Sequence, residues 1–341
     1  MSTQQALFLE KPKGDFVVNT RDIPTPPAGE ILIKIHATAL NPVDWKIQKY
    51  AAFIKNYPAI LGTDLAGEVE ALGDGVTKFK KGDRILAQGY FTNDRATFQQ
   101  YTLIPERFIA KIPESLAFDQ AATIPVAFLA AVTGLFGGKG LGAGLNPDVE
   151  WPAPQQKDQT IVIIGGSSSV GQYAIQLSKF LGFSTIVAYA SKKHHALLAD
   201  LGATQLVDRA AVPLEKLDTA VSGPAKIVYD AVASAESQEI ATKIVSTEGA
   251  VITVGEDKRS EKPADKTFLN VFGSSFAPGH EVFGEKLWAK VGRLLEEKII
   301  RPNRLEVIPG GLNGIVSGLK RLENNEISGE KLVVRPQETE T

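Results

Sequence analysis

The chain changes its pattern of apolar and polar positions near residue 120. Before that point, residues 30–40 (EILIKIHATAL) alternate apolar with polar positions, and AGEVEALG and GDRILAQG are short apolar runs between glycine turns. A period of two is typical of strands with one buried face. Residues 1 to about 120 are therefore predicted to be rich in strands, as in a small barrel or sandwich.

The middle of the chain predicts helix followed by loop. Residues 114–136 (ESLAFDQAATIPVAFLAAVTGLF) have the Ser/Asp start and alanine content of a helix. The uncharged run 121–138 is long, but it contains Pro125 and lacks flanking basic clusters, which favours a buried helix over a membrane span. Residues 137–159 are rich in Gly, Pro and polar side chains and predict a loop or surface insertion.

From Thr160 onward, short Val/Ile-rich runs alternate with helical segments. Five of these runs are predicted to be buried strands: TIVIIGG, STIVAYA, TQLVD, AKIVYDAV and GAVITVG. The segment SVGQYAIQLSKFLG is predicted to be an amphipathic helix that ends near Gly182. This alternation indicates a parallel sheet covered on both faces. After about residue 300 the pattern is irregular and ends in SGEKLVVRP, a strand expected to return to the first domain.

Composition narrows the classes of function. The 341 residues are 43% hydrophobic, which suits about two domains, and the formal net charge of −2 gives no general attraction to nucleic acid or a membrane. The absence of cysteine excludes disulfides and thiolate chemistry. The first residues lack the apolar core of a signal peptide, so a cytoplasmic location is expected.

The sharpest motif is IVIIGGSSSVGQYAIQ (161–176), in which an apolar strand runs through a turn of small residues into a helix. Gly165 and Gly166 allow a tight turn, Gly171 allows close packing, and free amides at the helix start suit a pyrophosphate. Serines replace the middle glycine of the G-x-G-x-x-G pattern. The motif predicts dinucleotide binding by Ser167, Ser168, Ser169 and Val170.

The end of the next predicted strand indicates which dinucleotide is bound. An NAD site places Asp or Glu about twenty residues after the glycine turn; here the strand leads into Ser191, Lys192, Lys193 and His194. A hydroxyl and cations suit a 2′-phosphate, so the residues predict NADPH over NADH. The alternative is a solvated helix start, although cations there oppose the helix dipole. Arg209 is either a second cation at this end or a plain surface residue.

Together with NPVDWK (41–46), residues 61–85 (LGTDLAGEVEALGDGVTKFKKGDRI), LGATQLVD and KIVYDAV, these motifs resemble a medium-chain dehydrogenase/reductase over nearly the whole chain. The resemblance implies an α/β fold with two domains. Residues 1–125 and 306–341 would form a GroES-like β-rich domain, and residues 126–305 a Rossmann NADP-binding domain with a doubly wound parallel sheet.

The same resemblance bears on metal binding. Zinc alcohol dehydrogenases of this family read Gly-His-Glu where this chain has Gly62, Thr63 and Asp64, and their ligand cysteine near residue 44 is missing. The four histidines do not recreate a set of converging ligands. No metal is therefore expected. Thr63 and Asp64 are interpreted as structural, with an acid–base role for Asp64 as the alternative.

Among metal-free branches, the chain resembles most the fungal ToxD-like trans-acting enoyl reductases and the quinone oxidoreductase-like double-bond reductases. This implies NADPH-dependent reduction of the C=C bond of an α,β-unsaturated carbonyl, with hydride added at Cβ and a proton at Cα. The substrate would be an enoyl chain on an acyl carrier or a small 2-alkenal, and a polyketide synthase is a candidate partner. The alternatives are an NADPH:quinone oxidoreductase and a non-catalytic NADPH-binding protein.

The resemblance also assigns candidate residues. Lys46, Tyr50 and Thr133 are the candidate catalytic residues, against the alternatives of a surface lysine, a pocket wall and a threonine bonded to its own helical turn. Further cofactor contacts are expected from Val43, Asp44, Trp45, Lys46, Val254, Gly255, Val333 and Val334. The substrate side is expected to include Thr133, Phe272, Gly273, Ser274, Ser275 and Phe276.

Overall fold

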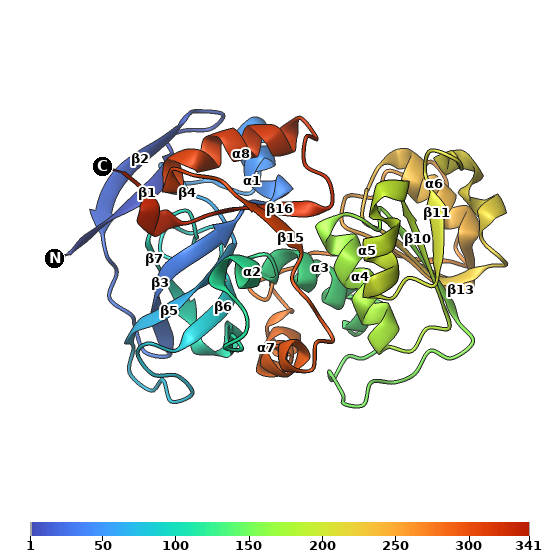
Figure 1. Ribbon diagram of the computed structural model, residues 1–341, viewed down its shortest axis with the longest axis horizontal. Coiled ribbons are helices and arrows are strands. Elements are labelled where there is room, and N and C mark those ends of the chain that lie inside the picture. The colour runs from blue at the N-terminus through green and yellow to red at the C-terminus, as the bar shows by residue number, and fades with distance from the viewer. Residues whose placement is uncertain (1, 341) are drawn as a thin grey trace. The chain divides into compact units, whose positions relative to one another are not determined.

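The computed structural model describes residues 2–340, which separate into two compact units (Figure 1). Unit 1 comprises Met1–Val126, Leu287–Glu297 and Arg301–Thr341, and unit 2 comprises Ala127–Lys286 and Lys298–Ile300. Residues 287–297 thus pack with unit 1, whereas the sequence placed them in the cofactor domain. The C-terminal segment belongs to unit 1.

Unit 1 is built on two sheets. The larger runs in the order β15-β16-β3-β5-β6-β8, with β7 paired to β3, and the smaller is β2-β1-β4. The strands are β1 (Thr3–Leu9), β2 (Phe16–Asp22), β3 (Glu30–Ala39), β4 (Ala59–Ile60), β5 (Asp64–Leu72), β6 (Arg84–Gln88), β7 (Tyr101–Pro105), β8 (Ile109–Lys111), β15 (Arg304–Val307) and β16 (Glu330–Val334).

The return of the C-terminal strand is confirmed, because Val333 and Val334 of β16 pair antiparallel with Ala39 and Thr38 of β3. Unit 1 also contains helices that the alternating pattern did not indicate. They are α1 (Pro42–Tyr50), α8 (Gly314–Glu323) and most of α7 (Glu281–Glu296). Helix α2 (Phe118–Ala122) also belongs to unit 1 and lies within the segment 114–136 that was predicted to be helical.

Helix α1 begins within the NPVDWK motif for local reasons. Asn41 precedes the helix in an extended conformation and Pro42 occupies its first position, where the missing N–H costs nothing. The backbone N–H of Asn41 donates to Oδ2 of Asp44, three residues on, at 2.9 Å. The helix ends at Ala51, which adopts the left-handed conformation with φ 53°.

Unit 2 is a six-stranded parallel sheet in the order β11-β10-β9-β12-β13-β14, which confirms the predicted doubly wound sheet. Its strands are β9 (Thr160–Ile164), β10 (Thr185–Ala190), β11 (Gln205–Asp208), β12 (Ala225–Asp230), β13 (Val245–Thr253) and β14 (Thr267–Asn270). Its helices are α3 (Pro125–Phe136), whose first two residues belong to unit 1, α4 (Ser169–Phe180), α5 (His195–Leu201) and α6 (Ala235–Ile244).

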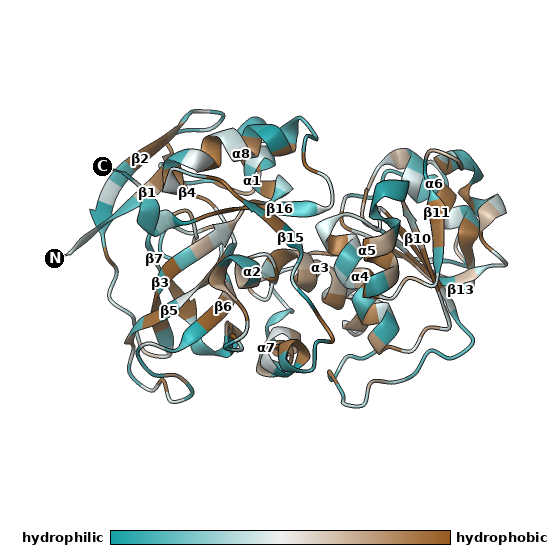
Figure 2. Ribbon diagram, in the orientation of Figure 1, coloured by the Kyte–Doolittle hydropathy of each residue, from teal (hydrophilic) through white to brown (hydrophobic). Residues whose placement is uncertain are grey.

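The burial of the strands follows the sequence pattern. Val162, Ile164, Val187 and Val228 belong to one buried cluster, and Figure 2 shows apolar colouring along the strands of unit 2. Residues 137–159 contain neither helix nor strand, as predicted. Among residues 2–340, no helix combines the length and apolar character needed to cross a bilayer.

Candidate active site

The turn between β9 and α4 has the geometry of a phosphate cradle. Gly165 adopts φ +79°, and a Cβ on Gly171 would lie 2.3 Å from the carbonyl oxygen of Gly165, so only glycine fits there. Ser168 precedes α4, and its hydroxyl accepts the backbone N–H of Gly171 at 3.0 Å. The half-buried serines 167–169 therefore lie at the helix start, where amides and the helix dipole favour an anion.

A single carboxylate organises the adjacent edge of the sheet. Oδ1 of Asp208 accepts the backbone N–H groups of Lys192, at 3.2 Å, and Ala210, at 3.1 Å. These bonds hold the loops that follow β10 and β11 against each other. The exposed side chains of Lys192, Lys193 and Arg209 therefore start from neighbouring loops, while Ser191 is half-buried and His194 is buried.

The segment 272–276 packs against helix α3 at Ala130, three residues before Thr133. A Cβ on Gly273 would lie 2.6 Å from the backbone nitrogen of Ala130, and Oη of Tyr229 donates to the carbonyl of Ala130 at 2.8 Å. Thr133 is 2% exposed, and within residues 2–340 its hydroxyl makes no hydrogen bond, so it is not bonded to its own helical turn. Ser274 and Ser275 are buried, whereas Phe272 is 45% exposed and Phe276 half-buried.

The end of β12 carries a second buried carboxylate. Asp230 accepts the backbone N–H groups of Val232, at 3.0 Å, and Ala233, at 3.1 Å, and the hydroxyl of Ser237 at 2.8 Å. Burial raises the pKa of Asp230, although these bonds oppose the rise. Asp230 thereby shapes the loop beside Val254 and Gly255, both half-buried.

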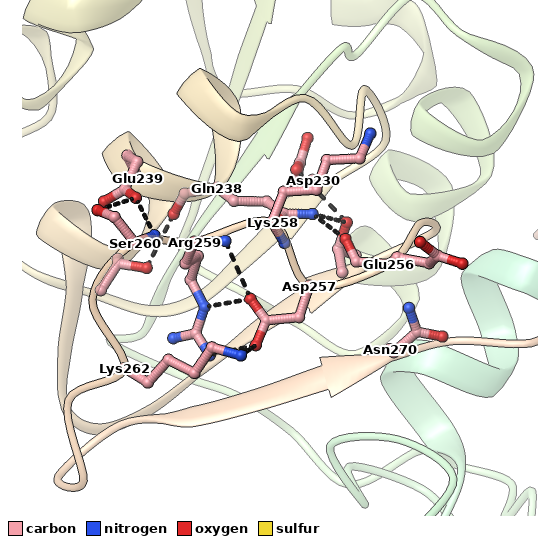
Figure 3. Close-up of polar contacts among 12 residues, drawn as sticks. Asp230, Gln238, Glu239, Glu256, Asp257, Lys258, Arg259, Ser260, Lys262 and Asn270 are labelled. Atoms are coloured by element: carbon pink, nitrogen blue, oxygen red, sulfur yellow. Dashed lines mark hydrogen bonds and ion pairs between the residues drawn. The ribbon is translucent and has the colours of Figure 1, made fainter.

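The loop that follows Gly255 is anchored by polar contacts, shown in Figure 3. The side-chain amide of Gln238 on α6 donates to the carbonyl of Glu256 at 2.8 Å and accepts the N–H of Lys258 at 2.6 Å. Asp257 pairs with Arg259 and, at 3.0 Å, with Lys262. We call residues 256–262 the anchored loop.

In unit 1, Asp64 lies at the centre of a buried network. Oδ2 of Asp64 accepts the side-chain amide of Asn41 at 2.8 Å and forms an ion pair with Nζ of Lys331. Nζ of Lys331 also donates to Oδ1 of Asn41 at 2.9 Å. Oδ1 of Asp64 accepts the backbone N–H of Val126, in the first turn of α3, at 2.7 Å. We call Asn41, Asp64 and Lys331 the buried hub.

The buried hub is sealed from solvent. The side chains of Lys331 and Asp64 are 4% and 0% exposed, and Asn41 is buried. Asp44 lies beside it, and burial raises its pKa to about 7, with the nearby Asp64 charge adding to the rise and the backbone amide of Asn41 opposing it. The hub holds the first turn of α1, the strand β5, the strand β16 and the first turn of α3 together.

The remaining candidates on unit 1 differ in accessibility. Lys46 is exposed, with Nζ 5.7 Å from the centroid of the Trp45 ring, and Tyr50 is 60% exposed. Val43 and Trp45 are half-buried, while Asp44, Val333 and Val334 are buried. A contact from Asp44 to a cofactor would therefore use the backbone. The catalytic and binding roles of all these residues stay predictions.

Sequence reasoning missed Lys331 and the side chain of Asn41. Asn41 stood in the NPVDWK motif but was not singled out, and Lys331 lies 267 residues from Asp64. The signal was weak, because Lys331 follows Glu330 and only borders the apolar residues 332–334 of β16, as an ordinary surface lysine could. The interpretation of Asp64 as a structural residue matches its place in the hub.

The donor set around Thr63 and Asp64 does not fit a zinc centre. The carboxylate of Asp64 is already paired with the ammonium of Lys331, and a threonine hydroxyl is a poor zinc ligand. Across residues 2–340, no group of three or more His, Cys, Asp or Glu side chains is arranged to hold a metal ion. We therefore derive no chemical step through a metal.

Comparisons with known proteins extend over both units. Residues 27–114 match the family described as alcohol dehydrogenase GroES-like domain, and residues 169–287 match the family described as zinc-binding dehydrogenase. The zinc in the latter description is not matched by the donor set described above.

Relatives and solved structures cover nearly the whole chain. It is 32% identical over 322 residues to the trans-enoyl reductase himH of Aspergillus japonicus, covering 91% of each chain. It is 30% identical over 356 residues to lovC of Aspergillus terreus, the enoyl reductase component of lovastatin nonaketide synthase, covering 97% of this chain and 96% of that one. An alcohol dehydrogenase superfamily protein from Novosphingobium aromaticivorans superimposes with a TM-score of 0.81 at 26% identity, covering 97% and 99% of the two chains. The chain therefore belongs to the medium-chain dehydrogenase/reductase family, as an oxidoreductase of the enoyl reductase type with a fold that binds a nicotinamide cofactor.

Proposed function

We propose that the protein reduces the C=C bond of an α,β-unsaturated carbonyl compound with NADPH. The observation that carries this proposal is the 32% identity to a trans-enoyl reductase over 91% of both chains. The structure supports it with a glycine-shaped phosphate cradle and, on α3, a buried threonine hydroxyl that makes no hydrogen bond within residues 2–340.

The cofactor fits the residues of unit 2. Gly171 lets the start of α4 pack directly against the turn at Gly165, where a Cβ would clash with the backbone, and the amides at the start of α4 suit a pyrophosphate. A bound, reduced nicotinamide supplies hydride to the Cβ of a conjugated alkene. Ser167 and Ser169 add hydroxyl donors at the phosphates.

Residues of this chain then stabilise the negative charge that develops on the substrate oxygen and supply the proton that is added at Cα. The hydroxyl of Thr133 donates a hydrogen bond to the substrate oxygen, where negative charge develops. Lys46 or Tyr50 gives a proton to Cα, and both side chains are exposed. The segment 272–276, packed against α3, supplies the apolar wall for an acyl chain through Phe272 and Phe276.

The preference for NADPH is assigned to cations at the adenosine end. Lys192, Lys193 and Arg209 extend from the two loops joined by Asp208, which suits a 2′-phosphate. Replacing Lys192 and Lys193 together with alanine should raise the KM for NADPH about 10- to 100-fold and leave the KM for NADH within about twofold. Lys157→Ala, another exposed lysine of unit 2, is the matched control. Equal losses with both cofactors would contradict this assignment.

The activity itself is tested by following NADPH oxidation with a 2-alkenal, an enoyl thioester and a naphthoquinone. Turnover of the enal or the thioester, with product reduced at the C=C bond, is the expected result. A higher rate with the thioester would favour a carrier-bound substrate and a polyketide synthase as partner. Turnover of the quinone alone would replace the proposal, and binding of NADPH without turnover of any substrate, including a carrier-bound enoyl chain, would indicate a binding protein.

A further inference from the structure

The buried hub connects the two helices that carry the candidate catalytic side chains. Asn41 is the residue that precedes α1, and Lys46 follows in the second turn of that helix. Val126 lies in the first turn of α3, and Thr133 follows it by seven residues, which places the two on one face of that helix. Asp64 bonds to Asn41 through one carboxylate oxygen and to Val126 through the other.

Lys331 fixes the hub to a third segment. Its ammonium contacts both Asp64 and Asn41, and it extends from β16, which is held to β3 through the N–H of Leu40 and the carbonyl of Leu332 at 2.9 Å. The hydroxyl of Thr38 donates to the carbonyl of Asp64 and ties β5 to β3. The hub therefore joins side chains or backbone from β5, β16, the start of α1 and the start of α3.

A carboxylate is well suited to this task. It accepts bonds at both oxygens, and bonds to an ionised acceptor are shorter and stronger than neutral ones. Because the hub is buried, water does not compete for these bonds, and the directions of the two helix starts are set by the protein alone.

We propose that Asp64, with Lys331 and Asn41, is a positioning residue that sets the first turns of α1 and α3 and, through each helix separately, the orientation of Lys46 on α1 and of Thr133 on α3. The proposal deepens the function proposed above and rests on it for the activity measurement. On this proposal the hub residues affect the rate of the reaction as well as the stability of the fold. A misplacement of about 1 Å in a catalytic group costs up to about 100-fold in rate.

Two double variants separate positioning from stability. Asp64→Asn with Lys331→Met removes the ion pair but keeps an oxygen for the N–H of Val126 and an amide for Asn41. Asp64→Leu with Lys331→Met also removes the ion pair but offers no polar atom to either helix. Lys111→Met with Asp83→Asn removes another ion pair of unit 1, whose atoms lie 2.8 Å apart, and serves as the control.

The readouts are kcat and KM in the enoyl assay and hydrogen–deuterium exchange of peptides that contain residues 41–50 and 125–133. The leucine variant should lose about 10- to 100-fold in kcat and exchange faster in both peptides, while the asparagine variant and the control keep kcat within about threefold of wild type.

Equal kcat values for the leucine and asparagine variants, or unchanged exchange in the two peptides, would overturn the positioning role. If the wild-type protein reduces none of the test substrates, the proposed function fails. The exchange measurement then still decides whether the hub sets the two helix starts.

Discussion

The buried hub of unit 1 and the anchored loop of unit 2 both pair an aspartate with basic side chains, but they differ in burial and in how far apart along the chain the paired residues lie. In the hub, the side chains of Lys331 and Asp64 are 4% and 0% exposed and each bonds to a different element. In the anchored loop, Asp257 pairs with Arg259 and Lys262 within six residues of chain; the side chains of Asp257 and Lys262 are 25% and 62% exposed, and that of Arg259 is 5% exposed. The first network joins distant segments, and the second shapes one segment.

The difference in setting predicts a difference in energy. A buried pair is costly to break, because the remaining charge has no water to solvate it. A pair at the surface gains little from its attraction, since water and salt screen it. Ion pairs of similar length should therefore differ several-fold in the free energy lost when one partner is removed.

The largest effect is expected for Lys331→Met alone. The variant leaves Asp64 ionised and buried without its cation, and the free energy of unfolding should fall by about 3 to 5 kcal/mol. Adding Asp64→Asn should recover most of that loss, because no buried charge of the pair then remains. Denaturant unfolding of both variants measures the difference, and a double variant no more stable than Lys331→Met would contradict this account of the hub.

Asp44 extends the comparison to pH. Burial raises its pKa to about 7 in the folded chain, against an ordinary value of 3.8. Between these values the folded state keeps the proton and the unfolded state loses it, so the free energy of unfolding falls as pH rises from about 4 to 7. Asp44→Asn removes this loss and keeps an acceptor for the N–H of Asn41. Its advantage over wild type should be absent near pH 4 and reach a few kcal/mol near pH 8.

Asp83 provides a control of opposite sign. Although burial alone would raise its pKa, the bonds from Lys111 and from the backbone of Lys80 lower it overall. Asp83→Asn should therefore cost stability at neutral pH, and that cost should shrink as pH falls below the ordinary value of 3.8. Unfolding curves for Asp44→Asn and wild type that stay parallel from pH 4 to 8 would contradict an uncharged Asp44.

The same contrast explains what could be predicted from the sequence. The strands of unit 2 and the turn at Gly165 and Gly171 could be predicted, because short Val/Ile runs and closely spaced glycines are patterns formed by residues that are near one another in the sequence. The anchored loop is also local. By contrast, helix α8 follows a segment with irregular apolar spacing, and its start includes Gly314, a poor helix former, so the pattern did not indicate it.

The hub could not be assembled from the sequence, because its members come from residues 41, 64 and 331 and meet only in the folded sheet. Asp64 was singled out because it occupies the turn in which related zinc enzymes carry Gly-His-Glu. No residue near it in the sequence indicates that Lys331 is its ion-pair partner. The hydroxyl of Thr133 was likewise ambiguous, since only the structure shows that it is not bonded to its own helix. Long-range polar contacts are thus the part of the site that requires coordinates.

The smallest effect is expected in the anchored loop. The hydrogen bonds from Arg259 hold the pKa of Asp257 well below its usual range, and the guanidinium lies 3.7 Å from the centroid of the Phe268 ring. Asp257→Asn removes the negative charge but keeps an amide oxygen for the guanidinium of Arg259, whose side chain is 5% exposed and stays stacked on Phe268. The free energy of unfolding at neutral pH should therefore fall by about 1 to 2 kcal/mol, less than in Lys331→Met. The loss should shrink further in high salt, whereas the loss in Lys331→Met should not, since a buried charge is poorly screened. A loss of about 3 kcal/mol or more in Asp257→Asn would show that the anchored loop, although its ion pairs are only partly buried, supports the fold of unit 2 as strongly as the hub supports unit 1.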